Sequence, residues 1–84
     1  MLRDNKTVLV TVRNQRNELK VKVDRLHRFV MKSEDFKHLS PSHQLLLKKQ
    51  LYYMIKTLEI LEERVKDLDR QVAKEKELEE EVGR

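Results

Sequence analysis

The chain has no cysteine, no tryptophan, one glycine and one proline among its 84 residues. Without cysteine, neither a disulfide nor a thiolate metal site can stabilise a small fold. With so few turn-forming residues, the chain has little means of connecting several strands. A glycine-rich phosphate loop is excluded, because the chain has a single glycine, Gly83. These absences argue against small β folds and metal-stabilised folds.

Long apolar runs are absent as well. No stretch approaches the roughly 20 apolar residues that span a bilayer. The first residues also lack the basic start, apolar stretch and small-residue cleavage site of a secretory signal. We therefore expect a cytoplasmic protein with no membrane partner.

What the sequence does contain favours long helices. Charged residues make up 40% of the chain, and Leu, Lys, Glu and Arg are abundant. Apolar positions recur at heptad spacing in a first segment: Leu9, Val12, Leu19, Val23, Leu26 and Val30. A second segment continues the spacing: Leu47, Leu51, Met54, Leu58, Leu61, Val65, Leu68 and Val72. We call these two sets the seams of the two predicted helices.

Signals for starts and ends fix the boundaries of these helices. We predict a single domain over residues 1–84, with a first helix at about 4–32, a break at 33–40 and a second helix at about 41–80. Asp4 or Asn5 is a suitable first cap, and Ser40-Pro41 is a strong start for the second helix. The β-branched run from Thr7 to Val12 could form a strand, but no second strand exists to pair with it.

A break this short joins antiparallel neighbours. The predicted fold is therefore all-α: an antiparallel two-helix hairpin with a long second helix. Arg16 would then lie near Leu61, within reach of Glu62 or Glu63. Residues 70–84 would extend past the first helix, either as a solvated tail or as part of a coil between subunits.

A second stripe runs beside each seam and mixes apolar, aromatic and hydrogen-bonding residues. On the first helix it consists of Val8, Thr11, Gln15, Glu18, Lys22, Arg25 and Phe29. On the second helix it consists of Leu46, Gln50, Tyr53, Thr57, Ile60 and Arg64. Such a composition is typical of an interface, and it predicts a homo-oligomeric helical bundle. The alternative is a monomeric hairpin with scattered exposed apolar residues.

Charge is distributed unevenly along the chain, whose net charge is +4. Residues 1–32 hold nine basic and three acidic side chains, whereas residues 57–84 hold six and ten. This asymmetry either steers an anionic partner to the first half or supports antiparallel pairing of the two helices.

The residue types needed for catalysis are not arranged for it. His27, His38 and His43 lack the one-turn spacing of a metal pair. The serines of the break are cap residues without a nucleophile motif. The carboxylates of the second helix have the pattern of a solvated face: Glu62, Glu63, Asp67 and Asp69. We expect no enzymatic activity, no bound metal and no cofactor.

One cluster could bind a ligand. Lys22, Arg25 and Phe29 lie at three- and four-residue spacing, which places them on one helix face. Cations beside an aromatic ring can bind phosphates and stack a base. The alternative is that the basic side chains lie along the apolar seam or pair with acids.

A family resemblance rests on a combination of short motifs. In the first helix these are Glu18-Leu19, Lys22-Val23, Arg25-Leu26 and Phe29-Val30. In the break they are Ser33-Glu34-Asp35-Phe36 and Leu39-Ser40. In the second helix they are Leu46-Leu47, Gln50-Leu51, Met54, Ile60-Leu61 and Arg64-Val65. Over about residues 13–68 the chain resembles the helical-hairpin family of small tailed-phage proteins, which includes anti-CBASS and anti-Thoeris nucleotide sponges.

The resemblance implies an all-helical oligomer, often a hexamer. It also implies binding of cyclic oligonucleotide or cyclic ADP-ribose-type signals between protomers, without cleavage, in the host cytoplasm. Carried over by position, Lys22, Arg25 and Arg64 would contact phosphates, and Phe29 or Tyr53 would contact a base. Members often have Tyr at position 57, where this chain has threonine, with Tyr52 and Tyr53 one turn earlier.

Three functions follow from these observations. The first is a phage anti-defence sponge that sequesters cyclic nucleotide signals. The second is a non-catalytic protein–protein interaction module, such as an inhibitor of a host protein or an assembly factor. The third is nucleic-acid binding through the basic first helix, which is disfavoured by the acidic second half.

Overall fold

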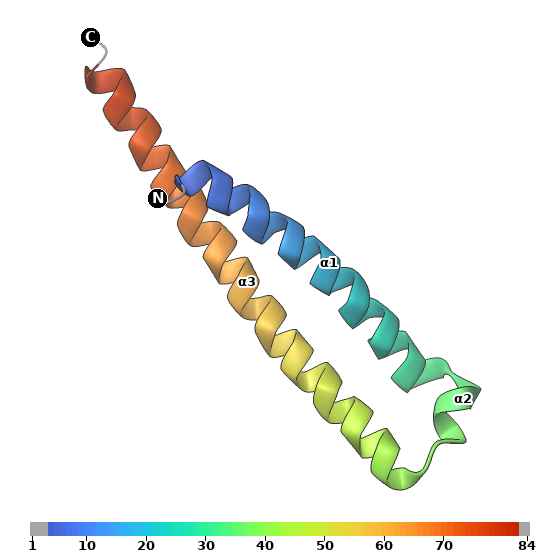
Figure 1. The fold of residues 1–84 in the computed structure, drawn as a ribbon. Helices are drawn as coiled ribbons and strands as arrows, with labels where there is room; N and C mark the ends of the chain where they lie inside the picture. Colours follow the sequence, from blue (N-terminus) through green and yellow to red (C-terminus); the bar gives the residue numbers. More distant parts are fainter. Residues whose placement is uncertain (1–3, 83–84) are drawn as a thin grey trace.

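The protein is an elongated helical hairpin in a computed structural model that describes residues 4–82 (Figure 1). Its elements are α1 (Asn5–Lys32), the short α2 (Glu34–Lys37) and α3 (Pro41–Val82). The helices α1 and α3 run antiparallel side by side, and the molecule is 66 Å long. The described residues include no strand, so the prediction of an all-α fold is confirmed.

The start of α1 is fixed by a side-chain cap. The Thr7 backbone N–H donates to the Asp4 carboxylate over 2.8 Å, so Asp4 takes the capping role. The β-branched run that follows is helical, and Leu9 and Val12 within it are buried. Tertiary packing therefore outweighs the strand propensity of this segment.

The cap also predicts a titration. The hydrogen bond from the Thr7 backbone N–H favours the charged carboxylate and lowers the pKa of Asp4 below its ordinary value. A depressed pKa means that the cap is complete above the unfolded value, and that it is lost as the pH falls through the folded value. We expect the Thr7 amide proton shift in NMR to titrate with a midpoint below 3.8, the ordinary value. A midpoint at or above that value would contradict the cap, and the Asp4→Asn variant should abolish the titration.

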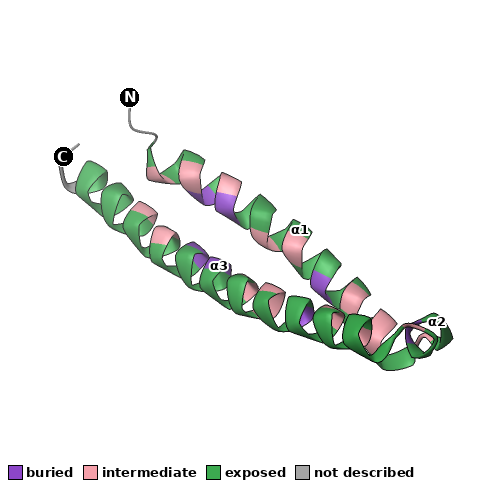
Figure 2. Cartoon of the chain, turned by 60° about the horizontal axis from the view of Figure 1, so that its bottom comes forward, coloured by how far each residue is buried: buried purple, intermediate pink, exposed green. Residues whose placement is uncertain are grey.

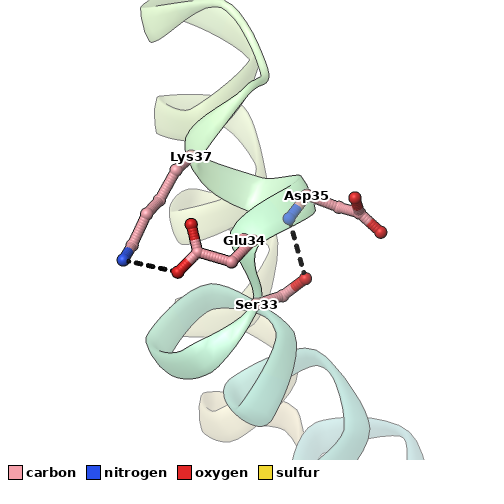
Figure 3. A network of polar contacts seen from close by, with 4 residues as sticks. All are labelled: Ser33, Glu34, Asp35 and Lys37. Carbon is pink, nitrogen blue, oxygen red and sulfur yellow. Dashed lines mark hydrogen bonds and ion pairs between the residues drawn. The ribbon is translucent and has the colours of Figure 1, made fainter.

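The break between the long helices contains a helical turn of its own (Figure 3). Ser33 caps it, since its hydroxyl accepts a hydrogen bond from the Asp35 N–H over 3.2 Å. Lys37 pairs with Glu34 over 3.1 Å on the exposed side. Phe36, from the same turn, is buried. The break therefore closes the end of the hairpin with a hydrophobic plug.

The start of α3 follows the predicted Ser-Pro signal. Ser40 accepts a hydrogen bond from the His43 N–H over 3.2 Å, and Pro41 is the first helical residue. The Gln44 side chain donates to the Leu39 carbonyl over 2.9 Å, and this hydrogen bond ties the end of the break to the first turn of α3. These hydrogen bonds satisfy backbone groups that the tight connection would otherwise leave unpaired.

The hydrophobic core is a narrow seam between α1 and α3 (Figure 2). The buried residues of the described chain are Leu9, Val12, Val23, Phe36, Leu51, Leu61 and Val65. All except Phe36 lie on the two predicted seams. The largest cluster joins Leu9 and Val12 of α1 to Leu61 and Val65 of α3. Seven buried side chains are few for a chain of this length, so the core is thin.

Polar contacts across the seam lie at the open end of the hairpin, and they correct one expectation. Arg16 does not reach Glu62 or Glu63; its guanidinium donates to the adjacent Asn17 side chain. The ion pair between the helices is instead Arg13 with Asp69, at 2.6 Å. Arg16 occupies a seam position and is half-buried, so its head turns along its own helix to reach water.

The long helix continues past the start of α1. The Asn5 side-chain amide donates to the Glu75 carboxylate, which places the first residue of α1 level with that part of α3. Beyond this contact α3 remains helical to Val82 and extends alone (Figure 1). No helix within residues 4–82 is long and apolar enough to cross a membrane.

Candidate functional site

The two mixed stripes predicted from the sequence lie on one face of the hairpin. An open groove at the end nearest the chain termini joins Val8 from the α1 stripe to Ile60 and Arg64 from the α3 stripe. On the opposite face, the ion pair joins Arg13 and Asp69, each one position after a seam residue. We call the face that carries both stripes the mixed face.

Lys22 and Arg25 stand on the α1 part of the mixed face. Both side chains are exposed, and neither forms a salt bridge within residues 4–82. They flank Val23, which is buried against α3 and holds this part of α1 in place. The seam therefore fixes the backbone while the two cations remain free to contact an anion.

Phe29 lies further along α1 and takes part in the closed end of the hairpin. Its ring meets that of Phe36 edge to face, with 5.9 Å between the ring centroids. Lys48 lies 5.9 Å from the centre of the Phe36 ring. Phe29 is half-buried, so part of its surface stabilises the break and only the remainder is open to a ligand.

Tyr53 is the exposed aromatic residue of the α3 part of the mixed face. Its side chain is 66% exposed, and its ring meets Tyr52 edge to face at 5.3 Å. Thr57, one turn later, donates its hydroxyl to the Tyr53 carbonyl over 2.9 Å. The threonine hydroxyl is therefore engaged with its own helix, and Tyr53 supplies the aromatic surface at this level.

Arg64 lies in the open groove, which has a volume of about 350 Å³. The groove has an apolar lining from Val8, Ile60 and Leu68, and the charged residues Glu63 and Asp67 adjoin Arg64. Two carboxylates against one guanidinium make the groove unfavourable for a phosphate in a single chain. Arg64 therefore needs another source of positive charge to hold an anion.

The five predicted ligand residues lie on one face of the hairpin but at different positions along its long axis. The Asn5–Glu75 contact sets the register of α1 against α3. Because both helices rise by about 1.5 Å per residue, Lys22 and Arg25 lie level with about residues 55–58 of α3, beside Tyr53. Arg64 lies about two turns, or roughly 11 Å, further along the axis. Phe29 lies near the break at the other end. One chain thus brings Lys22, Arg25 and Tyr53 together and leaves Arg64 apart.

Two features of the mixed face went unrecognised in the sequence. Glu63 and Asp67 are exposed, as the pattern of a solvated face predicts, and they also line the open groove beside Arg64. Leu78 continues the stripe of α3 by helical spacing and is 60% exposed on the extended part of the helix. The spacing of Leu78 from Arg64, fourteen residues or two heptads, was the available signal.

The described residues contain no group of three or more histidine, aspartate or glutamate side chains that could hold a metal ion.

A family model named Sequestin matches residues 6–67. The chain belongs to the Sequestin family. The match covers about three quarters of the sequence and includes the break and all five predicted ligand residues. No curated protein and no solved structure matches the chain. The resemblance to a sponge-type helical-hairpin family is therefore confirmed, and the Sequestin name indicates a sequestering function.

Proposed function

We propose that this chain is a phage anti-defence sponge that binds cyclic nucleotide signals between copies of itself and does not cleave them. The observation that carries the proposal is the mixed face of a Sequestin-family chain. On this face Lys22 and Arg25 stand exposed at the level of Tyr53. Two cations beside an exposed ring match a ligand that presents phosphates and a base together.

The chemistry of this face suits retention of a ligand more than its conversion. Lys and Arg side chains bind phosphate oxygens by charge-assisted hydrogen bonds, and a tyrosine ring stacks on any base. Lysine and arginine side chains carry a positive charge at neutral pH, so the proposal gives Lys22, Arg25 and Arg64 the role of cations. Binding alone lowers the free concentration of a messenger when the protein is in excess.

A second copy gives the site the enclosure that one chain lacks. An exposed helix face offers a nucleotide contact from one side only, whereas binding sites for small molecules bury most of the ligand surface. Apolar residues beside the cations, such as Ile60 at 57% exposed, would bury the surrounding surface when copies pack together. The proposal therefore places each ligand at an interface, in an assembly as large as a hexamer.

The test is a thermal shift and calorimetry panel of cyclic dinucleotides, cyclic trinucleotides and cyclic ADP-ribose isomers. We expect one class to raise the melting temperature and to be recovered intact, since a ligand that binds only the folded state stabilises it by mass action. Linear mononucleotides serve as the control. No shift with any member of the panel, or recovery of a cleaved product, would contradict the proposal.

A second function has support from the opposite face of the hairpin. Leu45 and Tyr52 lie there by helical spacing and are each more than half exposed, which suits a protein partner. Capture of one host protein in stoichiometric amount, with no nucleotide bound, would favour the interaction module over the sponge.

A further inference from the structure

The exposed apolar side chains of the described chain outnumber the buried ones. Nine large apolar side chains are at least half exposed, compared with seven in the core. Four of the nine lie on the α3 part of the mixed face, as far as the extended tail: Leu46, Tyr53, Ile60 and Leu78. Leu78 has no part of α1 beside it, because α1 begins level with Glu75. A partner that covers this face must therefore reach beyond the two-helix region.

Charge divides the molecule along its length. Residues 22–58, which form the half nearest the break, carry eight basic and three acidic side chains, for a net charge of +5. Residues 4–21 and 59–80 carry nine basic and eleven acidic side chains, for a net charge of −2. Two such rods attract each other when they lie antiparallel and repel each other when parallel. The complementary occupant of the mixed face is thus a second copy in the opposite direction.

The length of the hairpin fixes the register of such a pair. The part of α3 beside α1 extends from Pro41 to about Glu75, so its midpoint lies near residue 58, between Thr57 and Ile60. A two-fold axis at this point gives complete overlap of the two-helix regions. An isologous interface requires the face to complement itself. In this register the residues of the two copies complement one another at three levels, which are three positions along the helix axis.

Each level pairs groups of compatible chemistry. In such a pair, Ile60 would lie opposite the partner's Thr57 near the axis, and the Ile60 side chain would contact the threonine methyl group. One turn away, Arg64 would lie opposite the partner's Tyr53, a pairing of guanidinium and ring. At the ends, Leu78 would lie level with the partner's Leu39, beside the buried Phe36 of the break. The part of α3 that one chain leaves uncovered would thus gain a contact.

We propose that two copies pair antiparallel through the mixed face, with the two-fold axis near residue 58 of α3, and that each ligand site is completed in trans. In this pair Arg64 of one copy lies within about one turn of the partner's Arg25. Arg64, the partner's Arg25 and the partner's Lys22 then lie within about two turns of one another, and Glu63 and Asp67 beside Arg64 balance two of these charges in the ligand-free pair. The remaining positive charge favours an anionic ligand, whose phosphates the three cations would contact.

The trans site deepens the proposed function and rests on it for the identity of the ligand, but the pairing can be tested without any nucleotide. The absence of cysteine allows one spin label per chain. Labels at Ser42→Cys, near the start of α3, should lie about 50 Å apart along the axis in the antiparallel pair. Labels at Lys56→Cys, close to the two-fold axis, should be separated along the axis by only about 6 Å.

Pulsed electron spin resonance then gives a distinct result for each arrangement. A long distance at position 42 with a short one at position 56 supports the pairing. Equal distances at the two positions indicate a parallel pair, and the absence of any dipolar coupling indicates a monomer; either result overturns the inference. These measurements use ligand-free protein, so their failure is separate from a failure of the nucleotide panel.

The register has its own test in the dissociation constant of the pair. Arg64→Ala and Tyr53→Ala should each weaken the pair about tenfold. The double variant should be little weaker than either one, because both remove the same contact. Leu45→Ala is the control, since Leu45 lies on the opposite face by helical spacing and is 54% exposed. Equal effects of Tyr53→Ala and Leu45→Ala, or additive effects of the two mixed-face variants, would overturn this register.

Discussion

Replacing Leu61 with alanine is expected to unfold most of the hairpin in dilute solution. Leu61 is 8% exposed and belongs to the main cluster with Leu9, Val12 and Val65. Truncation of a buried leucine costs about 2–5 kcal/mol, because its apolar contacts are lost and a cavity remains. A single core in a chain of this size supplies about 3–5 kcal/mol. The loss is therefore comparable to the whole stability.

Urea denaturation followed by far-ultraviolet circular dichroism measures this loss. The matched control is Leu45→Ala, which removes the same side chain from a position that is 54% exposed. We expect the control to change the free energy of unfolding by less than about 0.5 kcal/mol. Similar unfolding midpoints for the two variants would show that the seam between α1 and α3 does not hold the fold.

The fold was largely predictable because a hairpin is built from local signals. The heptad spacing identified six of the seven buried residues, and the cap residues Asp4, Ser33 and Ser40 marked where helices begin. The contact of Arg16 was wrong for a physical reason. A half-buried arginine has several solvated directions within reach, and spacing alone does not choose among them. For the same reason, spacing alone did not predict the ion pair between Arg13 and Asp69.

The candidate site was less predictable than the fold. Periodicity placed all five predicted ligand residues on one face, and the groove joins Val8 of one stripe to Arg64 of the other. It did not place them at one level, because residues on different helices have an axial position set by the register of the hairpin. The carboxylates Glu63 and Asp67 also changed the electrostatics around Arg64. Such effects depend on three-dimensional proximity, which a single sequence does not contain.

The double variant Lys22→Ala, Arg25→Ala is expected to lose nucleotide binding while retaining the fold. Each charge-assisted hydrogen bond to a phosphate contributes about 1.5–3 kcal/mol. Loss of two should therefore weaken binding on the order of 100-fold or more. Both side chains are exposed and without an ion pair in the described chain, so the melting temperature without ligand should change little. Calorimetry with the nucleotide that gives the largest thermal shift measures the effect.

A matched double variant separates the position of the charges from their number. Lys20→Ala, Arg28→Ala removes the same two charges from exposed positions of α1 outside the mixed face. Long-range attraction depends on net charge and is screened by salt, so both double variants should lose that part of the affinity equally. If Lys22 and Arg25 contact phosphate directly, the mixed-face variant should bind the nucleotide more weakly than the control variant at physiological salt. If the two variants bind equally, the mixed face attracts the ligand without holding it, and the binding site lies elsewhere on the chain.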